Sequence, residues 1–102
     1  MNVYNGSGEK HGSWEEYYSN GKLYWRKNYI NGKLHGLYEC YWFNGNLMYK
    51  ANYVNGKKHG IREEHWFNGK LALKGIYVNG NEHGLFECYN EDGNLNFKTY
   101  YL

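Results

Sequence analysis

The chain is a succession of short segments in which aromatic and polar residues mix, and glycine-containing pairs separate these segments at regular distances. A His-Gly pair recurs every 24 residues, at His11-Gly12, His35-Gly36, His59-Gly60 and His83-Gly84. Between these, an Asn-Gly or Asp-Gly pair keeps the same period, at Asn20-Gly21, Asn44-Gly45, Asn68-Gly69 and Asp92-Gly93. Self-similarity at a fixed period indicates a repeat protein. We therefore predict one repeat domain, 7–102, made of units 7–30, 31–54, 55–78 and 79–102 after a short leader, 1–6.

Each unit is predicted to form two antiparallel strands. Asn-Gly between extended, aromatic-rich segments is typical of a tight hairpin, because both turn residues must take positive φ. We take Asn44-Gly45 as a two-residue loop within a unit and 31–34 as a four-residue loop between units. Both choices place Glu39 in one register, opposite Lys50 on one side and Arg26 on the other. The chain is therefore predicted to be all-β, an open, elongated, twisted antiparallel meander of about eight strands in a single layer.

A closed eight-stranded barrel is the alternative architecture for the same strands. It would have to hold four tryptophans and many tyrosines on its inward face. An interior of that strand count only just accommodates ordinary side chains. The open sheet is therefore preferred.

The predicted register places two ladders of residues across the sheet. One alternates in charge at every strand: Glu15, Arg26, Glu39, Lys50, Glu63, Lys74, Glu87 and Lys98. Facing opposite charges contribute about 0.2–1 kcal/mol per pair and oppose a slip of the register. The other ladder alternates glycine and tyrosine: Gly12, Tyr29, Gly36, Tyr53, Gly60, Tyr77, Gly84 and Tyr101. We expect each of these rings to lie over the bare backbone of a neighbouring glycine.

The two-residue alternation of strands divides the side chains between two faces. The more apolar face is expected to carry most of the aromatic rings together with Leu23, Leu47, Leu71 and Leu95. The opposite face is expected to carry the charge ladder, the four repeat histidines, Tyr17, Tyr41 and Tyr89. In a single-layer sheet the aromatic face must pack along the sheet, against a second copy or against a partner.

Composition and charge exclude several classes of protein. A chain of 102 residues has room for one domain. Its formal net charge is +2 and its basic residues are scattered, which argues against a binder of duplex DNA. The longest uncharged stretch, Cys40 to Tyr49, is too short to span a membrane, and the amino terminus lacks the pattern of a signal peptide. Two cysteines do not make a disulfide framework, so we expect a reducing, cytoplasmic location.

The repeated string resembles a known family. Asn-Gly-Lys-x-His-Gly, a strand rich in Glu and Tyr, and then Asn-Gly-Lys-Leu are similar to the MORN-repeat variant of YwqK-type antitoxins, over residues 7–102. The resemblance implies interaction with proteins or lipids, in some members neutralisation of a co-encoded toxin. It carries no catalytic residues over to this chain.

The candidate chemical groups favour structural roles. Equivalent histidines in successive units lie about 10 Å apart at ~4.8 Å per strand, so they cannot share one metal ion; we expect each imidazole to bond a turn backbone instead. Cys40 and Cys88 lie four strands apart, too far for a disulfide, and Cys40 has no dedicated base. Carboxylates such as Glu39 face basic residues, which keeps them ionised and unsuited to proton donation. We predict no enzyme activity, no metal and no cofactor.

The functional prediction is a protein-binding module, and its most specific form is an antitoxin or immunity protein that occludes a co-encoded toxin. Aromatic side chains and arginine supply most interface energy, which predicts these partner-binding residues: Trp14, Tyr18, Trp25, Tyr38, Trp42, Tyr49, Arg62 and Trp66. Alternatives are peripheral membrane or phospholipid binding, a homo-oligomeric scaffold joined through sheet edges or the aromatic face, and binding of a small ligand or single-stranded nucleic acid. The same rings could instead be only the core of the fold.

Overall fold

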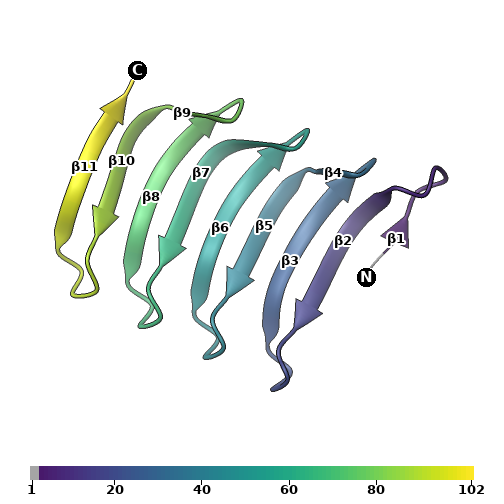
Figure 1. The fold of residues 1–102 in the computed structure, drawn as a ribbon, viewed down its shortest axis with the longest axis horizontal. Helices are drawn as coiled ribbons and strands as arrows, with labels where there is room; N and C mark the ends of the chain where they lie inside the picture. The colour runs from purple at the N-terminus through teal and green to yellow at the C-terminus, as the bar shows by residue number, and fades with distance from the viewer. Residues whose placement is uncertain (1–2) are drawn as a thin grey trace.

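The computed structural model describes residues 3–102, and within this range eleven strands form one antiparallel sheet (Figure 1). The strands are β1 (Val3–Tyr4), β2 (Lys10–Tyr17), β3 (Leu23–Ile30), β4 (Lys33–Leu34), β5 (Gly36–Tyr41), β6 (Leu47–Val54), β7 (Lys57–His65), β8 (Leu71–Val78), β9 (Asn81–Glu82), β10 (Gly84–Tyr89) and β11 (Leu95–Tyr101). Neighbours in the sheet follow chain order, and the Cα atoms extend over 47 × 39 × 10 Å. The open, single-layer meander is therefore confirmed.

Eight long strands carry the four units, and three two-residue strands account for the rest. β4 and β9 pair with β3 and β8 directly after a turn, and His35 and His83 separate them from β5 and β10. β1 pairs with β2 through Val3 opposite His11 and Tyr4 opposite Lys10, so the leader adds an edge strand to the sheet. The first two residues of the predicted leader lie outside the described range.

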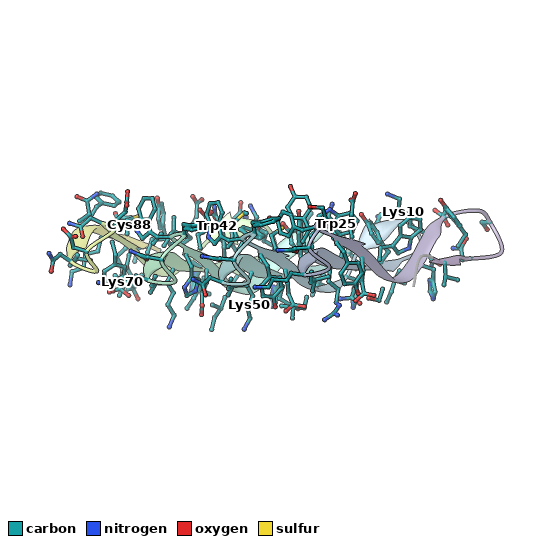
Figure 2. All side chains as sticks on the ribbon, turned by 90° about the horizontal axis from the view of Figure 1, so that it is seen from below. Lys10, Trp25, Trp42, Lys50, Lys70 and Cys88 are labelled. Atoms are coloured by element: carbon teal, nitrogen blue, oxygen red, sulfur yellow. The ribbon has the colours of Figure 1, made fainter. Side chains whose placement is uncertain are left out.

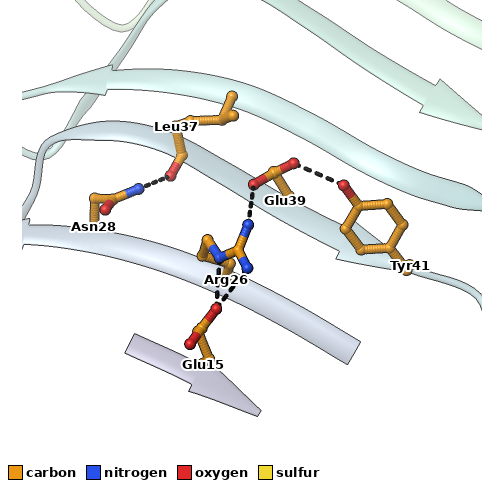
Figure 3. Close-up of polar contacts among 6 residues, drawn as sticks. All are labelled: Glu15, Arg26, Asn28, Leu37, Glu39 and Tyr41. Atoms are coloured by element: carbon orange, nitrogen blue, oxygen red, sulfur yellow. Dashed lines mark hydrogen bonds and ion pairs between the residues drawn. The ribbon is translucent and has the colours of Figure 1, made fainter. Parts of the chain in front are cut away.

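The register at the centre of the strands is the predicted one. Glu39 pairs with Arg26 on one side and with Lys50 on the other, and every other neighbouring pair of the charge ladder is also in register. Close contact forms only around Arg26: its guanidinium lies 2.6 Å from the Glu15 carboxylate and 3.7 Å from that of Glu39 (Figure 3). Tyr41 donates a hydrogen bond of 2.7 Å to the other oxygen of Glu39. Within residues 3–102 the ladder lysines have no carboxylate within 4.0 Å, so their pairing is one of register alone.

The two kinds of turn are the reverse of the prediction. Between units, Asn31 and Gly32 have φ of 48° and 81° and form a two-residue loop that pairs Ile30 with Lys33. Within a unit, the amide of Gly45 donates to the carbonyl of Trp42 at 2.9 Å, and the loop has three residues closed by a left-handed glycine. The four-residue loop at 31–34 and the two-residue loop at 44–45 were therefore wrong. Asn-Gly adopts positive φ at both residues only where the strands need the two-residue turn.

Bulges beside the turns explain why the central register is the predicted one although the turn lengths differ from the prediction. Within unit two, Cys40 pairs with Tyr49 but Tyr41 pairs with Leu47, which leaves Met48 as an extra residue. Between units, Tyr29 pairs with Leu34 while Arg26 pairs with Glu39, so two extra residues lie between these pairs. The glycine–tyrosine ladder is consequently continuous within units, as at Gly36 and Tyr53, and interrupted between them.

In the described residues no aromatic ring lies at the Cβ position of these ladder glycines. A Cβ on Gly12, Gly60 or Gly84 would meet no atom within 4 Å, and one on Gly36 would meet only the Cβ of Asn28. These glycines have φ between 75° and 94°, because they lie where the strand changes direction at the bulge and only glycine takes this conformation without strain. Their role is conformational. The ring-over-glycine contact occurs elsewhere, where Phe86 lies against Gly75.

The buried side chains lie along one face of the sheet. Within residues 3–102 the buried hydrophobic residues are Trp14, Ala51, Tyr77 and Phe86, and no charged residue is buried. Small residues face large ones across neighbouring strands, as Ala51 does opposite Tyr38. Over the same range, no helix is long and apolar enough to cross a membrane.

Candidate functional site

The two faces of the sheet differ in chemistry. Figure 2 shows Trp25, Trp42 and Cys88 on one side of the ribbon and Lys50 on the other. We call the first side the aromatic face, which carries Trp14, Trp25, Tyr38, Trp42, Tyr49 and Phe86. We call the second side the ladder face, because it carries the alternating charges. The main assignment of faces follows the prediction.

Bulges move some residues to the face opposite the predicted one. Leu23 was expected on the aromatic face, but it lines a small depression of about 260 Å³ together with Lys22, Tyr41 and Gly45. Tyr41 bonds the ladder residue Glu39, so this depression belongs to the ladder face. The extra residue at the bulge, Tyr24 in this unit, reverses the alternation at the end of the strand.

A larger depression lies on the aromatic face at the middle of the repeat array. It has a volume of about 420 Å³ and is lined by Tyr38, Cys40, Met48, Tyr49 and Glu64, from β5, β6 and β7. The rings of Tyr38 and Tyr49 meet edge to face with their centroids 5.4 Å apart. Met48 reaches the same depression as its chain neighbour Tyr49 because it is the bulged residue. The depression is therefore a product of the bulge as much as of the strand pairing.

Two basic side chains fix the rings around this depression. The ammonium of Lys27 lies 4.4 Å from the ring of Trp25 and 5.0 Å from that of Tyr38. The guanidinium of Arg62 lies 5.6 Å from the ring of Tyr49. Such cation–π contacts hold an aromatic plane in place without covering both of its faces.

Arg62 is itself held by its neighbours. It donates a hydrogen bond of 3.0 Å to the hydroxyl of Tyr77 and pairs with Glu64. It lies opposite Ala51 on β6 and Gly75 on β8, and these small residues leave room for its side chain. Arg62 thus helps to hold the rings around the depression in place. A partner would make its predicted contact with Arg62 at the rim of the depression.

Three of the titratable groups that line the depression have a raised pKa. Burial raises the pKa of the Tyr38 and Tyr49 hydroxyls and also raises the pKa of the Cys40 thiol. All three stay protonated near neutral pH, because a raised pKa favours the neutral acid. The depression therefore presents an apolar, neutral floor with one carboxylate at its edge.

Two of the predicted partner-binding residues join the leader to unit one and unit one to unit two. Trp14 is buried and its indole nitrogen donates to the carbonyl of Val3 at 3.1 Å. The hydroxyl of Tyr18 donates to the carbonyl of Tyr41 in the next unit at 2.6 Å. The indole nitrogen of Trp14 and the hydroxyl of Tyr18 therefore donate their hydrogen bonds within the fold.

Two further predicted anchors, Trp42 and Trp66, occupy equivalent positions in units two and three and make equivalent bonds. Each indole nitrogen donates at 3.0 Å to a carbonyl of the following unit, that of His65 for Trp42 and that of Tyr89 for Trp66. These indoles tie one hairpin to the next. An alanine there is expected to loosen the sheet and cannot serve as a pure test of binding.

The structure thus brings Tyr38 and Tyr49 into one depression, with Trp25 and Arg62 beside it, and their role in binding stays a prediction. Sequence reasoning missed Cys40, Met48 and Glu64 as lining residues. Alternation places Cys40 and Glu64 on the aromatic face, so they could have been found. Met48 could not, because its position depends on the bulge.

The histidines and cysteines have structural surroundings. The imidazole Nδ1 of His35 accepts from the amide of Asn55 at 3.4 Å, and that of His59 accepts from Asn79 at the same distance, so these two of the four repeat histidines bond a turn backbone as predicted. Among residues 3–102 no three His, Cys, Asp or Glu side chains are grouped to hold a metal ion. Cys40 and Cys88 are free thiols.

Comparison with known proteins agrees with the period and the fold. No protein of curated function matches the chain. The family model of the MORN repeat variant matches residues 10–33, 34–55, 58–79 and 82–102, and each match begins three residues after the start of a predicted unit. MORN repeats are commonly protein- or membrane-binding modules. Because these four matches make up most of its length, the chain belongs to the MORN repeat variant family.

Proposed function

We propose that this protein is a non-catalytic, cytoplasmic protein-binding module that docks on its partner through the depression on its aromatic face. The observation that supports this function is the grouping of Tyr38, Cys40, Met48, Tyr49 and Glu64 around one open volume at the centre of the array. Other predicted partner-binding residues instead donate hydrogen bonds within the fold: Trp14, Tyr18, Trp42 and Trp66. Tyrosine and methionine are typical of the buried centres of interfaces.

The lining suits a long side chain with an apolar stem and a hydrogen-bond donor at its end, such as lysine or arginine. The stem would lie across the rings of Tyr38 and Tyr49 and the thioether of Met48. Glu64 brings a carboxylate to the lining, and this carboxylate retains acceptor capacity beyond its pair with Arg62. A basic partner side chain would donate a further hydrogen bond to the Glu64 carboxylate at this rim.

The surrounding face gives the partner a rigid surface on which to lie. Standard protein interfaces bury about 800 Å² on each partner, so the depression serves as an anchor within a wider contact. The cation–π contacts of Lys27 and Arg62 hold the neighbouring rings in place before binding. Rings ordered in advance lose less entropy when a partner binds.

The finer form of this proposal is an antitoxin or immunity protein. The module would act by occlusion, covering a functional surface of a co-encoded toxin with its aromatic face. We expect co-expression with the product of a neighbouring gene to relieve growth inhibition in cells. Wild-type protein that gives no relief would remove the antitoxin role and leave the binding module intact.

The binding proposal is tested by capture of a partner from native lysate, followed by calorimetry with matched variants. Met48→Ala and Glu64→Gln alter the depression at half-buried side chains and leave the backbone pairing unchanged. Each is expected to weaken binding at least about tenfold, equivalent to about 1.4 kcal/mol. Tyr17→Ala removes an exposed ring on the ladder face and is the control, expected to bind as wild type.

Two outcomes would contradict this assignment of the surface. Equal affinity of Met48→Ala, Glu64→Gln and wild type would exclude the depression as the anchor. Binding of wild-type protein to anionic vesicles, falling steeply with salt, would favour membrane attachment. The alternating signs of the ladder and the small net charge of +2 supply no basic patch for such attachment.

A further inference from the structure

A second exposed surface lies on the ladder face, on the four adjacent strands β7, β8, β10 and β11. Its members are apolar and at least two-fifths exposed: Ile61 at 50%, Ile76 at 41%, Leu85 at 40% and Tyr100 at 68%. Ile61 pairs with Ile76, and Leu85 pairs with Tyr100. We call these four residues the apolar strip. Contiguous exposed apolar residues on a soluble protein indicate an interaction site.

The apolar strip is confined to units three and four. The same row in the first two units is Ser13, Asn28, Leu37 and Asn52, where Ser13 pairs with Asn28 and Leu37 with Asn52. The amide of Asn28 donates to the Leu37 carbonyl at 2.8 Å, so this part of the row bonds within the sheet (Figure 3). The repeat therefore does not by itself require an apolar row, and the second half of the sheet differs from the first.

A row of alternating charges runs directly beside the apolar strip. Its members on the same four strands are Glu63, Lys74, Glu87 and Lys98. Lys74 and Lys98 are exposed, and in the described chain neither ammonium has a carboxylate within 4.0 Å. Figure 2 shows the equivalent Lys50 extending away from the ribbon on this face. The lysine heads are thus placed to reach across to a second surface.

We propose that a second copy of this chain packs on the apolar strip, face to face, about a twofold axis that runs parallel to the strands between β8 and β10. This rotation reverses the order of the strands and keeps each row over the same row. Ile76 then covers the partner's Leu85, and Ile61 covers the partner's Tyr100. In the next row, Lys74 meets the partner's Glu87 and Glu63 meets the partner's Lys98.

The alternation of charge fixes this arrangement and selects a copy of the same chain. Reversing a row of alternating signs about a point between two strands brings every charge opposite its counter-charge. Placing the axis one strand-width away, on β8 itself, would instead stack Lys74 on the partner's Lys74 and Glu63 on the partner's Glu87. Like charges facing each other oppose that register. The interface is isologous, as twofold homodimers require.

The proposal is tested by analytical ultracentrifugation of wild type and two charge-reversed variants over a range of concentrations. Wild type is expected to dimerise reversibly. Lys74→Glu places two glutamates against each other at each of two symmetric contacts, and Glu87→Lys does the same with lysines. Each variant alone is expected to be monomeric, or to dimerise at least about tenfold more weakly.

Mixing the two variants separates this interface from any effect on folding. In a heterodimer the glutamate introduced at position 74 of one protomer meets the lysine introduced at position 87 of its partner. At the second symmetric contact the wild-type pair, Lys74 with Glu87, is retained, so the mixture is expected to regain association near the wild-type level. No repair within a single chain can produce this recovery. A mixture that stays monomeric, or wild type that is monomeric at millimolar concentration, would overturn the proposal.

Two further variants locate the contact on the sheet. Ile76→Asp introduces a charge at the centre of the apolar strip and is expected to abolish dimerisation while the circular dichroism spectrum stays that of wild type. Lys50→Glu reverses a ladder charge outside the four overlapping strands and is expected to leave dimerisation unchanged. Loss of the dimer in Lys50→Glu would refute an axis between β8 and β10, because only an overlap of the whole sheet would bring Lys50 into the contact.

Discussion

The contact between Phe86 and Gly75 offers a sharp test of how this single-layer sheet is packed. A methyl group added at Gly75 would meet three ring atoms of Phe86 at 2.3, 2.5 and 2.5 Å, well inside van der Waals contact. The ring cannot tilt freely, because it lies edge to face against Tyr77 on one side and Tyr101 on the other, with centroids 5.4 and 5.1 Å away. Gly75→Ala therefore forces either the ring or the strand to move.

Two opposing terms set the expected size of the effect. Overpacking of a well-packed site costs about 1–3 kcal/mol. Replacing glycine by alanine restricts the unfolded chain and stabilises the fold by about 0.4–1 kcal/mol, and the φ of Gly75 lies outside the left-handed region. The steric term is the larger, so Gly75→Ala is expected to lower the free energy of unfolding by about 1–2 kcal/mol.

Urea unfolding followed by circular dichroism measures this change. Gly6→Ala is the matched control, because a Cβ at Gly6 meets nothing within 4 Å and its φ is also outside the left-handed region; it is expected to be neutral or slightly stabilising. In a Phe86→Leu background the smaller side chain leaves room for the methyl group, so Gly75→Ala is expected to lose most of its cost. A Gly75→Ala variant as stable as wild type would refute the packing of this ring on the strand.

Three other substitutions test the remaining elements of the fold. Trp66→Phe removes the indole donor to the Tyr89 carbonyl and is expected to cost about 1 kcal/mol in urea unfolding. Asn55→Ala forces alanine into a left-handed turn position with φ of 50° and is expected to cost about 1–2 kcal/mol in the same assay. The Arg26 hydrogen bond lowers the pKa of Glu15, so its stabilising effect is present above the ordinary pKa of glutamate and disappears as pH falls through the lowered value. Carboxyl NMR titration should show this low midpoint, which Arg26→Met raises towards the ordinary value.

Conservative variants provide the controls for these three measurements. Trp25→Phe changes an indole nitrogen that donates no hydrogen bond within residues 3–102 and should alter stability less than Trp66→Phe. Asn55→Gly keeps the left-handed turn accessible and should retain stability that Asn55→Ala loses. For the titration, Lys50→Met removes a ladder cation that has no carboxylate within 4.0 Å in residues 3–102, so the midpoint of Glu15 should stay low. Equal losses in Trp25→Phe and Trp66→Phe would show that ring packing, not the bond between units, explains the result.

The sequence was sufficient for the period, the fold class and the central register because each has a local signal. His-Gly pairs give the period, Asn-Gly or Asp-Gly pairs mark the turns, and alternating charges leave one register in which opposite signs face each other at every strand. Glu39 between Arg26 and Lys50 is the clearest case, since both neighbours follow from sequence spacing. The family resemblance rests on the same repeated residues and covers nearly the whole chain.

The details at the strand ends could not be predicted in the same way. Two turn types can each be written with Asn-Gly, and only the backbone dihedrals separate the left-handed Asn31 from Asn44, which is not left-handed. Bulges then shift single residues between faces, which brings Met48 into the depression on the aromatic face and takes Leu23 out of that face. The contacts that the predicted anchors Trp42 and Trp66 make within the fold could not be predicted for a related reason. Their indole donors find carbonyls in the next unit, and that contact depends on the position of the hairpin tips.

Residues 3–102 form a single layer, which explains why this fold can present two different surfaces. A sandwich uses one face of each sheet for its core, whereas here the packing runs along the sheet, from unit to unit. The bonds from Trp42 to His65 and from Trp66 to Tyr89 span successive units at the hairpin tips, and the left-handed turn at Asn55 is bonded to the preceding unit at the opposite edge. The sheet is therefore held together by hydrogen bonds between turns on both sides and by the aromatic rings on one face. The depression on the aromatic face and the apolar strip on the ladder face remain open together, so binding a partner and pairing with a second copy can occur on the same molecule.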